Sequence, residues 1–542
     1  ESETMTRELF ETCLLLSKRL DKKYNKQTIA AKMTDVPGHT RSIIDPMYDA
    51  GIRLLHVGIN SACPLPSVPT FCRWRSPSGN DLLLVYQKDY GEDEVLPDGK
   101  TVVSINFTGD NHGPHSYERV KKIYADLRKR YPQAQLVGAS FNDVARELLL
   151  IKKDLPVVTS EIGDTWIFGY GGAPIRMAKF RAVSRLYSQW LNEGKIKKDS
   201  DVALDFAAEL GLIAEHTQGV DVKTHLRQWD KYDMDKFLKG RSEGIFSMAE
   251  ASWKEIDNYI DSAIAFLPAS LQKEAREVVA EVDKVKLEDN SKMKPMERKR
   301  WEQPIAGGMT LAGLSYQMFD GDDYDDFQNR YLRARYGWAL DDLGKRGLKE
   351  SHAVSVTLYA QTMAQSVRKE KKGTRIITEL RFPENEKVDK RVYPERIQVN
   401  CFTTKNGKRS EVALTIYGKP AVRLPESYWL SFTVPGIESV IAEKMGERVD
   451  LMDVVEKGNR QMHGIDRYVD LITSGETIRI SSKEAFLLNV GEAQGLNYST
   501  NYPDKRKGAH FNLNNNLWGT NFSMWNEGSL TYHFVIETLN RK

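Results

Sequence analysis

The chain has 542 residues, with 78 Lys plus Arg and 75 Asp plus Glu, so its formal net charge is +3. This balance offers no surface dedicated to nucleic acid, so we expect no nucleic-acid partner. No uncharged apolar run is long enough to span a membrane. Aromatic residues make up 10% of the chain, too many for a disordered protein. The length predicts about two to four domains.

The first 200 residues alternate short apolar runs with stretches of helical periodicity. We expect strands at 28–33, 52–59, 82–87, 102–107, 135–139 and 156–160, and helices at 6–22, 41–50, 117–130 and 142–151. This repetition predicts a parallel α/β architecture over residues 1–200. In such folds, functional residues gather on the loops that follow the carboxyl ends of the strands.

The rest of the chain divides into a helical part and a β part. Residues 201–348 are mostly helical in pattern, which predicts a helical bundle packed on the first domain. Residues 349–542 contain alternating or β-branched runs separated by turns, which predict a large antiparallel β-sandwich. The overall expectation is therefore a multidomain α/β, α and β protein.

Polar clusters follow several predicted strands or interrupt a helical pattern. They contain Asp35, Asp110, Asp164 beside Trp166, and His216. Each cluster has a structural alternative, because the acids can shape turns or cap helices, and a lone histidine can be a hydrogen-bonded core residue. Three acids after parallel strands would nevertheless lie together at the carboxyl ends of those strands, with a histidine nearby. Asp and His are suitable ligands for zinc.

The sequence around Asp35 resembles glycoside hydrolase family 38, the α-mannosidases. Residues 32–41 read Lys-Met-Thr-Asp-Val-Pro-Gly-His-Thr-Arg, and residues 50–58 read Ala-Gly-Ile-Arg-Leu-Leu-His-Val-Gly. The family has an Asp-Pro-Phe-Gly-His-Ser type motif after a barrel strand, and here Val-Pro replaces Pro-Phe. In the family this Asp is both the catalytic nucleophile and a zinc ligand, roles that the resemblance assigns to Asp35.

Three further segments are similar to motifs of the same family. Residues 163–170, Gly-Asp-Thr-Trp-Ile-Phe-Gly-Tyr, resemble the segment that carries the general acid/base, which corresponds to Asp164. Residues 108–110 look like its Gly-Asp-Phe substrate loop. Residues 214–216, Ala-Glu-His, resemble the segment that supplies a zinc histidine, with threonine in place of the following Asp. Together with residues 512–522, these patterns look most similar to an uncharacterised bacterial branch.

The resemblance implies a (β/α)7-type glycoside hydrolase/deacetylase barrel, then a helical bundle, then β-sandwich domains. Family members begin with a strand that carries His-x-Asp, which supplies two zinc ligands, and no such motif precedes Asp35. We therefore expect an N-terminally incomplete barrel, with residues 28–33 near an unpaired edge. Asp35 and His216 would be two of four zinc ligands. A fragment, a second polypeptide that completes the barrel, and loss of the site in this branch all stay open.

The function that the resemblance implies is a metal-dependent retaining glycoside hydrolase acting on an α-mannoside-like glycan. Asp35 would attack the anomeric carbon, and Asp164 would protonate the leaving oxygen and then activate water. Zn²⁺ would hold two sugar hydroxyls. The residues expected to contact the substrate are Asp110, His39, Asn111, Trp166, Tyr170 and Arg176.

Two alternative functions stay open. One is a polysaccharide deacetylase-like metal hydrolase, and the other is a non-catalytic carbohydrate-binding protein with the β domain as its module. A His-x-Asp motif upstream in the gene would favour an enzyme; without that segment we expect the 542-residue chain to lack glycosidase activity. Homo-oligomerisation is open, as is the compartment, which is the cytoplasm or the periplasm or exterior of a bacterium.

Overall fold

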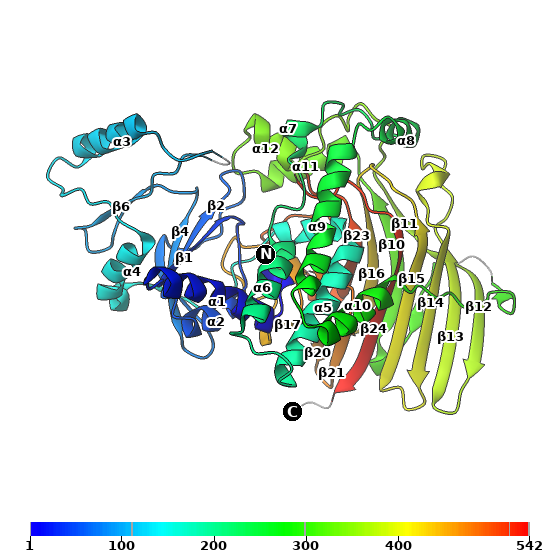
Figure 1. Ribbon diagram of the computed structural model, residues 1–542. Coiled ribbons are helices and arrows are strands. Elements are labelled where there is room, and N and C mark those ends of the chain that lie inside the picture. The colour runs from blue at the N-terminus through cyan, green and yellow to red at the C-terminus, as the bar shows by residue number, and fades with distance from the viewer. Residues whose placement is uncertain (1, 110–111, 297–299, 520, 540–542) are drawn as a thin grey trace.

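The computed structural model describes residues 2–109, 112–296, 300–519 and 521–539. Figure 1 shows an α/β unit formed by the first part of the chain, a group of helices beside it, and large antiparallel sheets on the far side of these helices. No helix among these residues is long and apolar enough to cross a membrane.

The α/β unit is built on a five-stranded sheet. Its strands, in spatial order, are β1 (Ala30–Asp35), β2 (Leu54–Ile59), β4 (Asp81–Gln87), β3 (Phe71–Arg75) and β7 (Val157–Val158). The first three are parallel, whereas β3 is antiparallel to β4 and parallel to β7. Its helices are α1 (Arg7–Tyr24), α2 (Ile44–Asp49), α3 (Tyr117–Arg130) and α4 (Phe141–Leu150).

The inner strands β2 and β4 are buried on both faces because most successive side chains along them are apolar. On β4, Leu83 and Val85 pack in a cluster with Ala145 and Leu148 of α4. Leu84 points to the opposite face and belongs to the main core of the molecule. Continuous burial of this kind is expected for parallel strands covered by helices on both sides.

The described residues form an open sheet, so the expected barrel is not confirmed. β1 and β7 are the edge strands, and β1 covers most of the segment that we expected beside an unpaired edge. Two expected strands differ from the prediction. Residues 102–107 provide only β6 (Val102–Ser104), which pairs with β5 (Asp93–Val95) in a separate hairpin. Residues 135–139 contain no strand; their apolar run is too short to pack on the sheet.

The helical part contains α5 (Pro174–Asn192), α6 (Asp201–Leu210), α8 (Met234–Ser242), α9 (Ser247–Ala265) and α10 (Ala269–Asp283). α6 packs on α9 and on α1, and α5 packs on α10. Aromatic rings also join α5 to α6, where the ring centroids of Tyr187 and Phe206 are 5.1 Å apart. The helices therefore connect the α/β unit to the rest of the protein.

The region 201–348, expected to be mostly helical, also contains the strand β10 (Thr310–Met318). This segment lies in the seven-stranded sheet between β11 (Val356–Tyr359) and β16 (Glu426–Thr433). Its side chains are buried from Gly313 onward, so both faces of the strand are covered and the alternation that identifies a half-exposed strand is lost. The short helices α11 (Gly321–Tyr331) and α12 (Gly337–Asp342) follow it.

The C-terminal part is the expected antiparallel β structure. The seven-stranded sheet continues with β23 (Ala509–Asn515), β22 (Leu487–Val490) and β19 (Met462–Gly464), while β9 (Gln303–Pro304) pairs with β10. The ten-stranded sheet has the order β18 (Glu447–Asp450), β17 (Ile437–Lys444), β20 (Tyr468–Thr473), β21 (Thr477–Ser482), β24 (Gly528–Leu539), β15 (Arg409–Lys419), β14 (Arg396–Thr404), β13 (Gly373–Arg381), β12 (Gln361–Lys369) and β8 (Lys294–Pro295). Phe534 of the larger sheet packs on Phe432 and Phe511 of the smaller one, with ring centroids 5.4 and 5.1 Å away.

A buried ion cluster joins the α/β unit to the sandwich. The ammonium of Lys444 on β17 lies 2.9 Å from a Glu3 carboxylate oxygen and 3.2 Å from one of Glu161. Glu161 also accepts hydrogen bonds from the Thr40 hydroxyl (3.1 Å) and the Arg41 backbone (2.8 Å). Each of the three charged side chains in the cluster is 2% exposed. The cluster fixes the segment that leads directly into the candidate site.

Candidate active site

Two loops that carry predicted catalytic residues pack directly against each other. The loop after β1 contains Gly38, and a Cβ on that residue would overlap backbone atoms of Ile162 and Gly163. The next residue, His39, forms an isolated β-bridge with Ile162. The Tyr86 hydroxyl donates to the Pro37 carbonyl at 2.6 Å and so holds the loop in place. The Asp35 loop is therefore fixed against the segment that contains Asp164.

Asp35 ends β1 and is the centre of a hydrogen-bond network. Its Oδ1 accepts hydrogen bonds from the Asn60 amide at 3.0 Å and from the Tyr90 hydroxyl, and its Oδ2 lies 3.2 Å from His216 Nε2. Burial raises the pKa of Asp35, but hydrogen bonds from His216, Tyr90 and Asn60 outweigh it and hold the pKa below its usual value. The carboxyl group is therefore ionised at neutral pH.

The backbone at Asp35 is strained. Its φ is 81°, which lies in a region where residues other than glycine are uncommon. Holding such a conformation costs about 1–3 kcal/mol, and residues of this kind cluster at functional sites. The strain is thus independent support for a functional role of this residue.

His216 is held between two carboxylates. Its Nδ1 contacts Glu215 and its Nε2 contacts Asp35. Burial lowers the pKa of His216, but the hydrogen bonds with Asp35 and Glu215 outweigh that effect and raise the pKa to about 10. The hydrogen bond with His216 lowers the pKa of Glu215 to about 2. The three groups form an Asp–imidazolium–Glu array that is partly open to solvent.

Tyr170 and Arg176 position the loop that carries His216. The Tyr170 hydroxyl hydrogen-bonds to the carbonyls of Ala214 (3.0 Å) and Glu215 (2.7 Å). Arg176 donates to Gln218 at 3.0 Å, and the Gln218 amide donates to the Glu215 carbonyl at 2.7 Å. Both side chains are buried. Their contacts are those of supporting residues, and substrate contact by either one stays a prediction.

Asp164 is buried on the neighbouring segment, with 1% exposure. Its Oδ1 accepts a hydrogen bond from the Trp166 backbone at 2.8 Å. The Trp166 indole donates to Cys63 Sγ at 3.1 Å, and its ring lies 5.8 Å from that of His216. Burial raises the pKa of the Cys63 thiol to about 12, and the carboxylates of Asp35 and Asp164 both add to this shift. Both predicted catalytic acids therefore act electrostatically on one thiol.

The remaining predicted residues are placed differently. Asp110 and Asn111 lie outside the described residues. His39 is 5% exposed, and neither of its ring nitrogens has a hydrogen-bond partner among the residues that the structure describes. Burial lowers the pKa of His39 to about 3, so its imidazole is neutral. Direct contact of these residues with a substrate stays a prediction.

The sequence analysis missed three polar contacts of this site, those made by Asn60, Tyr90 and Glu215. Asn60 directly follows β2, and Tyr90 comes three residues after the end of β4. The same rule that selected Asp35, namely that side chains after parallel strands converge, would have selected both. Glu215 was quoted only as part of the histidine motif, although its position beside His216 allowed a paired carboxylate.

The described residues do not by themselves fit a complete zinc site. Asp35 and His216 are adjacent, but within the described ranges no group of three or more His, Cys, Asp or Glu residues could hold a metal ion. Zinc sites use three or four protein ligands. Glu215 contacts the second ring nitrogen of His216, which is the usual position of a carboxylate that orients a metal-binding histidine. Zinc binding stays a prediction.

Comparisons with known proteins agree with this architecture. Residues 171–303 match the model of a domain of unknown function, DUF5054. No curated protein matches the chain. An alpha-mannosidase from Enterococcus faecalis V583 matches with a TM-score of 0.55 and 10% identity, over 100% of this chain and 77% of that one. A protein in glycosyl hydrolase family 38 from Enterococcus faecalis matches with a TM-score of 0.48 and 10% identity, over 99% and 76% of the two chains.

At 10% identity the first of these similarities concerns the fold alone. The chain shares the mixed multidomain architecture of that solved alpha-mannosidase, with helices, several sheets and a C-terminal antiparallel part. A shared fold hosts different activities, so a function must be argued from the site.

Proposed function

We propose that this chain carries the catalytic carboxylates of a retaining glycoside hydrolase that acts on α-mannoside-like glycans. The fold shared with the alpha-mannosidase from Enterococcus faecalis supports the class of enzyme. The observation that carries the proposal is the state of Asp35. Its carboxyl group is ionised, its backbone is strained, and its loop packs on the segment that contains Asp164.

In the proposed reaction, Asp35 attacks the anomeric carbon and forms a glycosyl-enzyme. A nucleophile must be ionised, and the hydrogen bonds from Tyr90 and Asn60 keep the Asp35 carboxylate in that form. Both bonds go to Oδ1, so the attacking oxygen is Oδ2, which His216 Nε2 contacts at 3.2 Å. The imidazolium must move aside from Oδ2, or share it, when the sugar binds.

Asp164 is the proposed general acid/base. It would give its proton to the leaving oxygen and then take one from the water that hydrolyses the intermediate. The Trp166 backbone N–H donates to Oδ1 and orients the carboxyl group. Retaining enzymes place their two carboxyl groups about 5–5.5 Å apart, and we expect this separation in a complex with substrate.

Zn²⁺ is part of the proposal only as an expected partner of Asp35 and His216. Because the described residues offer two ligands, at least one further ligand would have to come from elsewhere. No step of the mechanism above depends on the metal.

Covalent trapping tests the nucleophile directly. The complete gene product is incubated with a 5-fluoro-mannosyl fluoride, and its peptides are mapped by mass spectrometry. We expect the label on the peptide that contains Asp35, and none after Asp35→Asn. Asp205→Asn is the matched control, because Asp205 only pairs with Arg19 at the surface. A label on another carboxylate would show that the nucleophile is misassigned.

Leaving-group dependence tests Asp164. Asp164→Asn should slow cleavage of a mannobiose far more than that of a nitrophenyl mannoside, whose leaving group needs no proton. Equal losses for both substrates would contradict the acid/base assignment. Release of acetate from an acetylated polysaccharide without glycosidic cleavage would indicate the deacetylase alternative. Binding of glycans with no turnover would indicate a carbohydrate-binding protein.

A further inference from the structure

A large cavity lies between the helical part and the ten-stranded sheet, apart from the group around Asp35. Its volume is about 1040 Å³. One wall comes from α5 and α10, the other from β14, β15 and β24, and the connector at 284–289 closes one side. α10 contacts β24 directly, and Figure 1 shows these elements side by side. The size is at the upper end of pockets that bind small organic ligands.

The sheet wall of this cavity is polar. Two rows of side chains run across β14, β15 and β24 in register. The first row contains Gln398, Thr415 and Thr531, and the second contains Asn400, Ala413 and His533. Gln398 and Thr415 are each 3% exposed. The Thr415 and Thr531 hydroxyls pair with each other at 2.9 Å, and such a pair keeps one donor and several lone pairs for a polar ligand.

The helix wall contains the polar side chains of Arg185, Gln189 and Glu281 and a set of apolar ones that leave space. It presents Ala178 and Ala182, together with Leu186 and Val282. On the facing sheet, Ala413 stands between Asn400 and His533, so the second row has a gap at its middle. A pyranose has C–H groups on its faces and hydroxyls around its rim. The apolar side chains of the helix wall, opposite a row of hydroxyl and amide groups, match both.

The charges that line the cavity balance. Four lining side chains are cationic, and four are anionic: Arg185, Lys284, Lys286 and Lys483 against Glu281, Glu288, Asp289 and Glu484. A cavity built for a phosphate or an acidic sugar would have an excess of cations. The balance favours a ligand without net charge.

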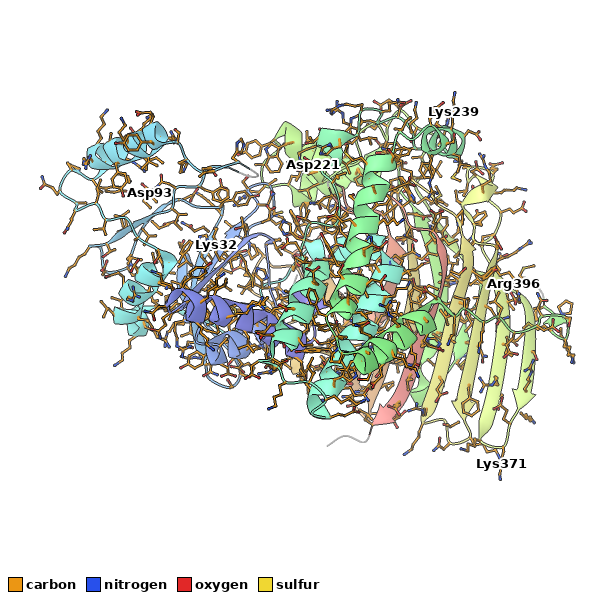
Figure 2. The ribbon with its side chains drawn as sticks, in the orientation of Figure 1. Lys32, Asp93, Asp221, Lys239, Lys371 and Arg396 are labelled. Atoms are coloured by element: carbon orange, nitrogen blue, oxygen red, sulfur yellow. The ribbon has the colours of Figure 1, made fainter. Side chains whose placement is uncertain are left out.

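Hydrogen bonds hold the walls in place before a ligand arrives. Gln398 receives a hydrogen bond from the Glu288 backbone N–H at 2.8 Å and donates to its carbonyl at 3.0 Å. Arg396, labelled in Figure 2, donates to the same carbonyl at 3.4 Å. Glu484 lies 3.0 Å from His533 Nδ1 and accepts from its backbone at 2.7 Å, so the imidazole is oriented with Nε2 available. Walls fixed in this way lower the entropic cost of binding.

We propose that this cavity is a binding site for a neutral oligosaccharide of two or three units, separate from the proposed catalytic site. The argument depends on the walls, charges and volume of the cavity and not on the proposed hydrolysis. Thr415, Thr531 and His533 make the polar contacts, while Ala413 and Ala182 leave room for the rings. The site would hold a glycan on the β domain whichever bond the enzyme cleaves.

Isothermal titration calorimetry on the complete gene product tests this site, with mannotriose, maltotriose, cellotriose and the acidic trigalacturonate as probes. We expect at least one neutral trisaccharide to bind and trigalacturonate to bind more weakly. Ala413→Trp fills the gap and should weaken binding at least tenfold. Tyr417→Trp is the matched control, because Tyr417 lies outside the cavity lining on the same strand, and it should leave binding unchanged.

Thr531→Val keeps the shape of the wall and removes one hydroxyl, so it tests the site even if the tryptophan variant does not fold. We expect binding to weaken about fivefold, with hydrolysis of a nitrophenyl mannoside unchanged. The proposal is overturned if no neutral trisaccharide binds, if trigalacturonate binds best, or if binding survives both changes in folded protein. Failure of the proposed hydrolysis would show as absent turnover with trisaccharide binding intact, so the two failures can be told apart.

Discussion

The α/β unit and the ten-stranded sheet place their polar residues according to opposite rules. β1, β2 and β4 are parallel, so their carboxyl ends lie at one edge, and Asp35, Asn60 and Tyr90 meet there. In the antiparallel sheet, neighbouring strands run in opposite directions and their ends alternate. Its polar side chains instead form rows across one face. Strand direction thus decides whether functional groups gather at an edge or on a face.

The two regions also differ in how they are stabilised. β24 pairs with a strand on each side, and its apolar residues interlock with the smaller sheet. Among the described residues, β1 pairs with β2 alone, and Asp35 at its end is strained. The strained edge depends on the cluster around Lys444 for its attachment to the sandwich. We therefore predict that substitutions in the Lys444 cluster affect the site around Asp35 more than they affect the polar rows of the ten-stranded sheet.

The largest effect is expected for Lys444→Met. Removing one member of a buried ion cluster leaves uncompensated charge and costs about 3–5 kcal/mol. Here Glu3 and Glu161 would remain buried without their cation. The free energy of unfolding, measured with urea at pH 7, should fall by that amount.

The matched control is Lys371→Met, labelled in Figure 2, because Lys371 lies exposed in the turn between β12 and β13. It should change stability by less than about 0.5 kcal/mol. The loss caused by Lys444→Met should shrink at acidic pH, because burial raises the pKa of Glu3 and its carboxyl group then becomes neutral. A loss that is independent of pH would show that packing, and not charge, holds the junction.

The second-largest effect is expected for Gly38→Ala, on catalytic activity. Gly38→Ala places a methyl group where Ile162 and Gly163 have backbone atoms, so the Asp35 loop must move away from the Asp164 segment. Misplacement of a catalytic group by about 1 Å can cost on the order of 100-fold in rate. We expect kcat/KM to fall by about that factor while the thermal transition of the sandwich is kept. Gly337→Ala, whose added methyl group would meet no atom within 4 Å, serves as the control for kcat/KM.

His216 should link stability to alkaline pH. Its pKa in the folded protein is raised to about 10 from an ordinary value of 6.5. A raised pKa means that its contribution is complete below about pH 6.5 and disappears as the pH rises towards 10. The difference in unfolding free energy between the wild type and His216→Gln should therefore be constant up to pH 6.5 and decrease above it. A difference that grows with pH would contradict the imidazolium array.

The positions of some strands and helices were predictable from the sequence, and tertiary contacts were not. The run 28–33 predicted β1 within two residues, and Tyr117–Arg130 forms the helix expected there. Asp35 and His216, which the motifs assign to one site, lie 3.2 Å apart, and their catalytic and metal-binding roles stay predictions. The supporting roles of Tyr170 and Arg176 depend on the distant loop at Ala214–Gln218. Periodicity carries no information on such contacts, nor on whether a sheet closes into a barrel.

The smallest effect is expected for Tyr90→Phe. This variant tests the rule that side chains after parallel strands converge, because Tyr90 was not selected from the sequence. The hydroxyl donates to Oδ1 of Asp35 and helps to hold the pKa of that carboxyl below its usual value. A hydrogen bond to the charged form stabilises it, so its removal must raise the pKa of Asp35. The acidic limb of the kcat/KM profile should therefore move to higher pH.

The fall in kcat/KM at the optimum should be less than about tenfold, because His216 and Asn60 still contact the carboxylate. Tyr117→Phe on the exposed surface of α3 is the control, and it should leave the profile unchanged. An acidic limb that stays in place in Tyr90→Phe would show that Asp35 does not control it. The convergence of strand-end residues would then describe the architecture of this edge without explaining its chemistry.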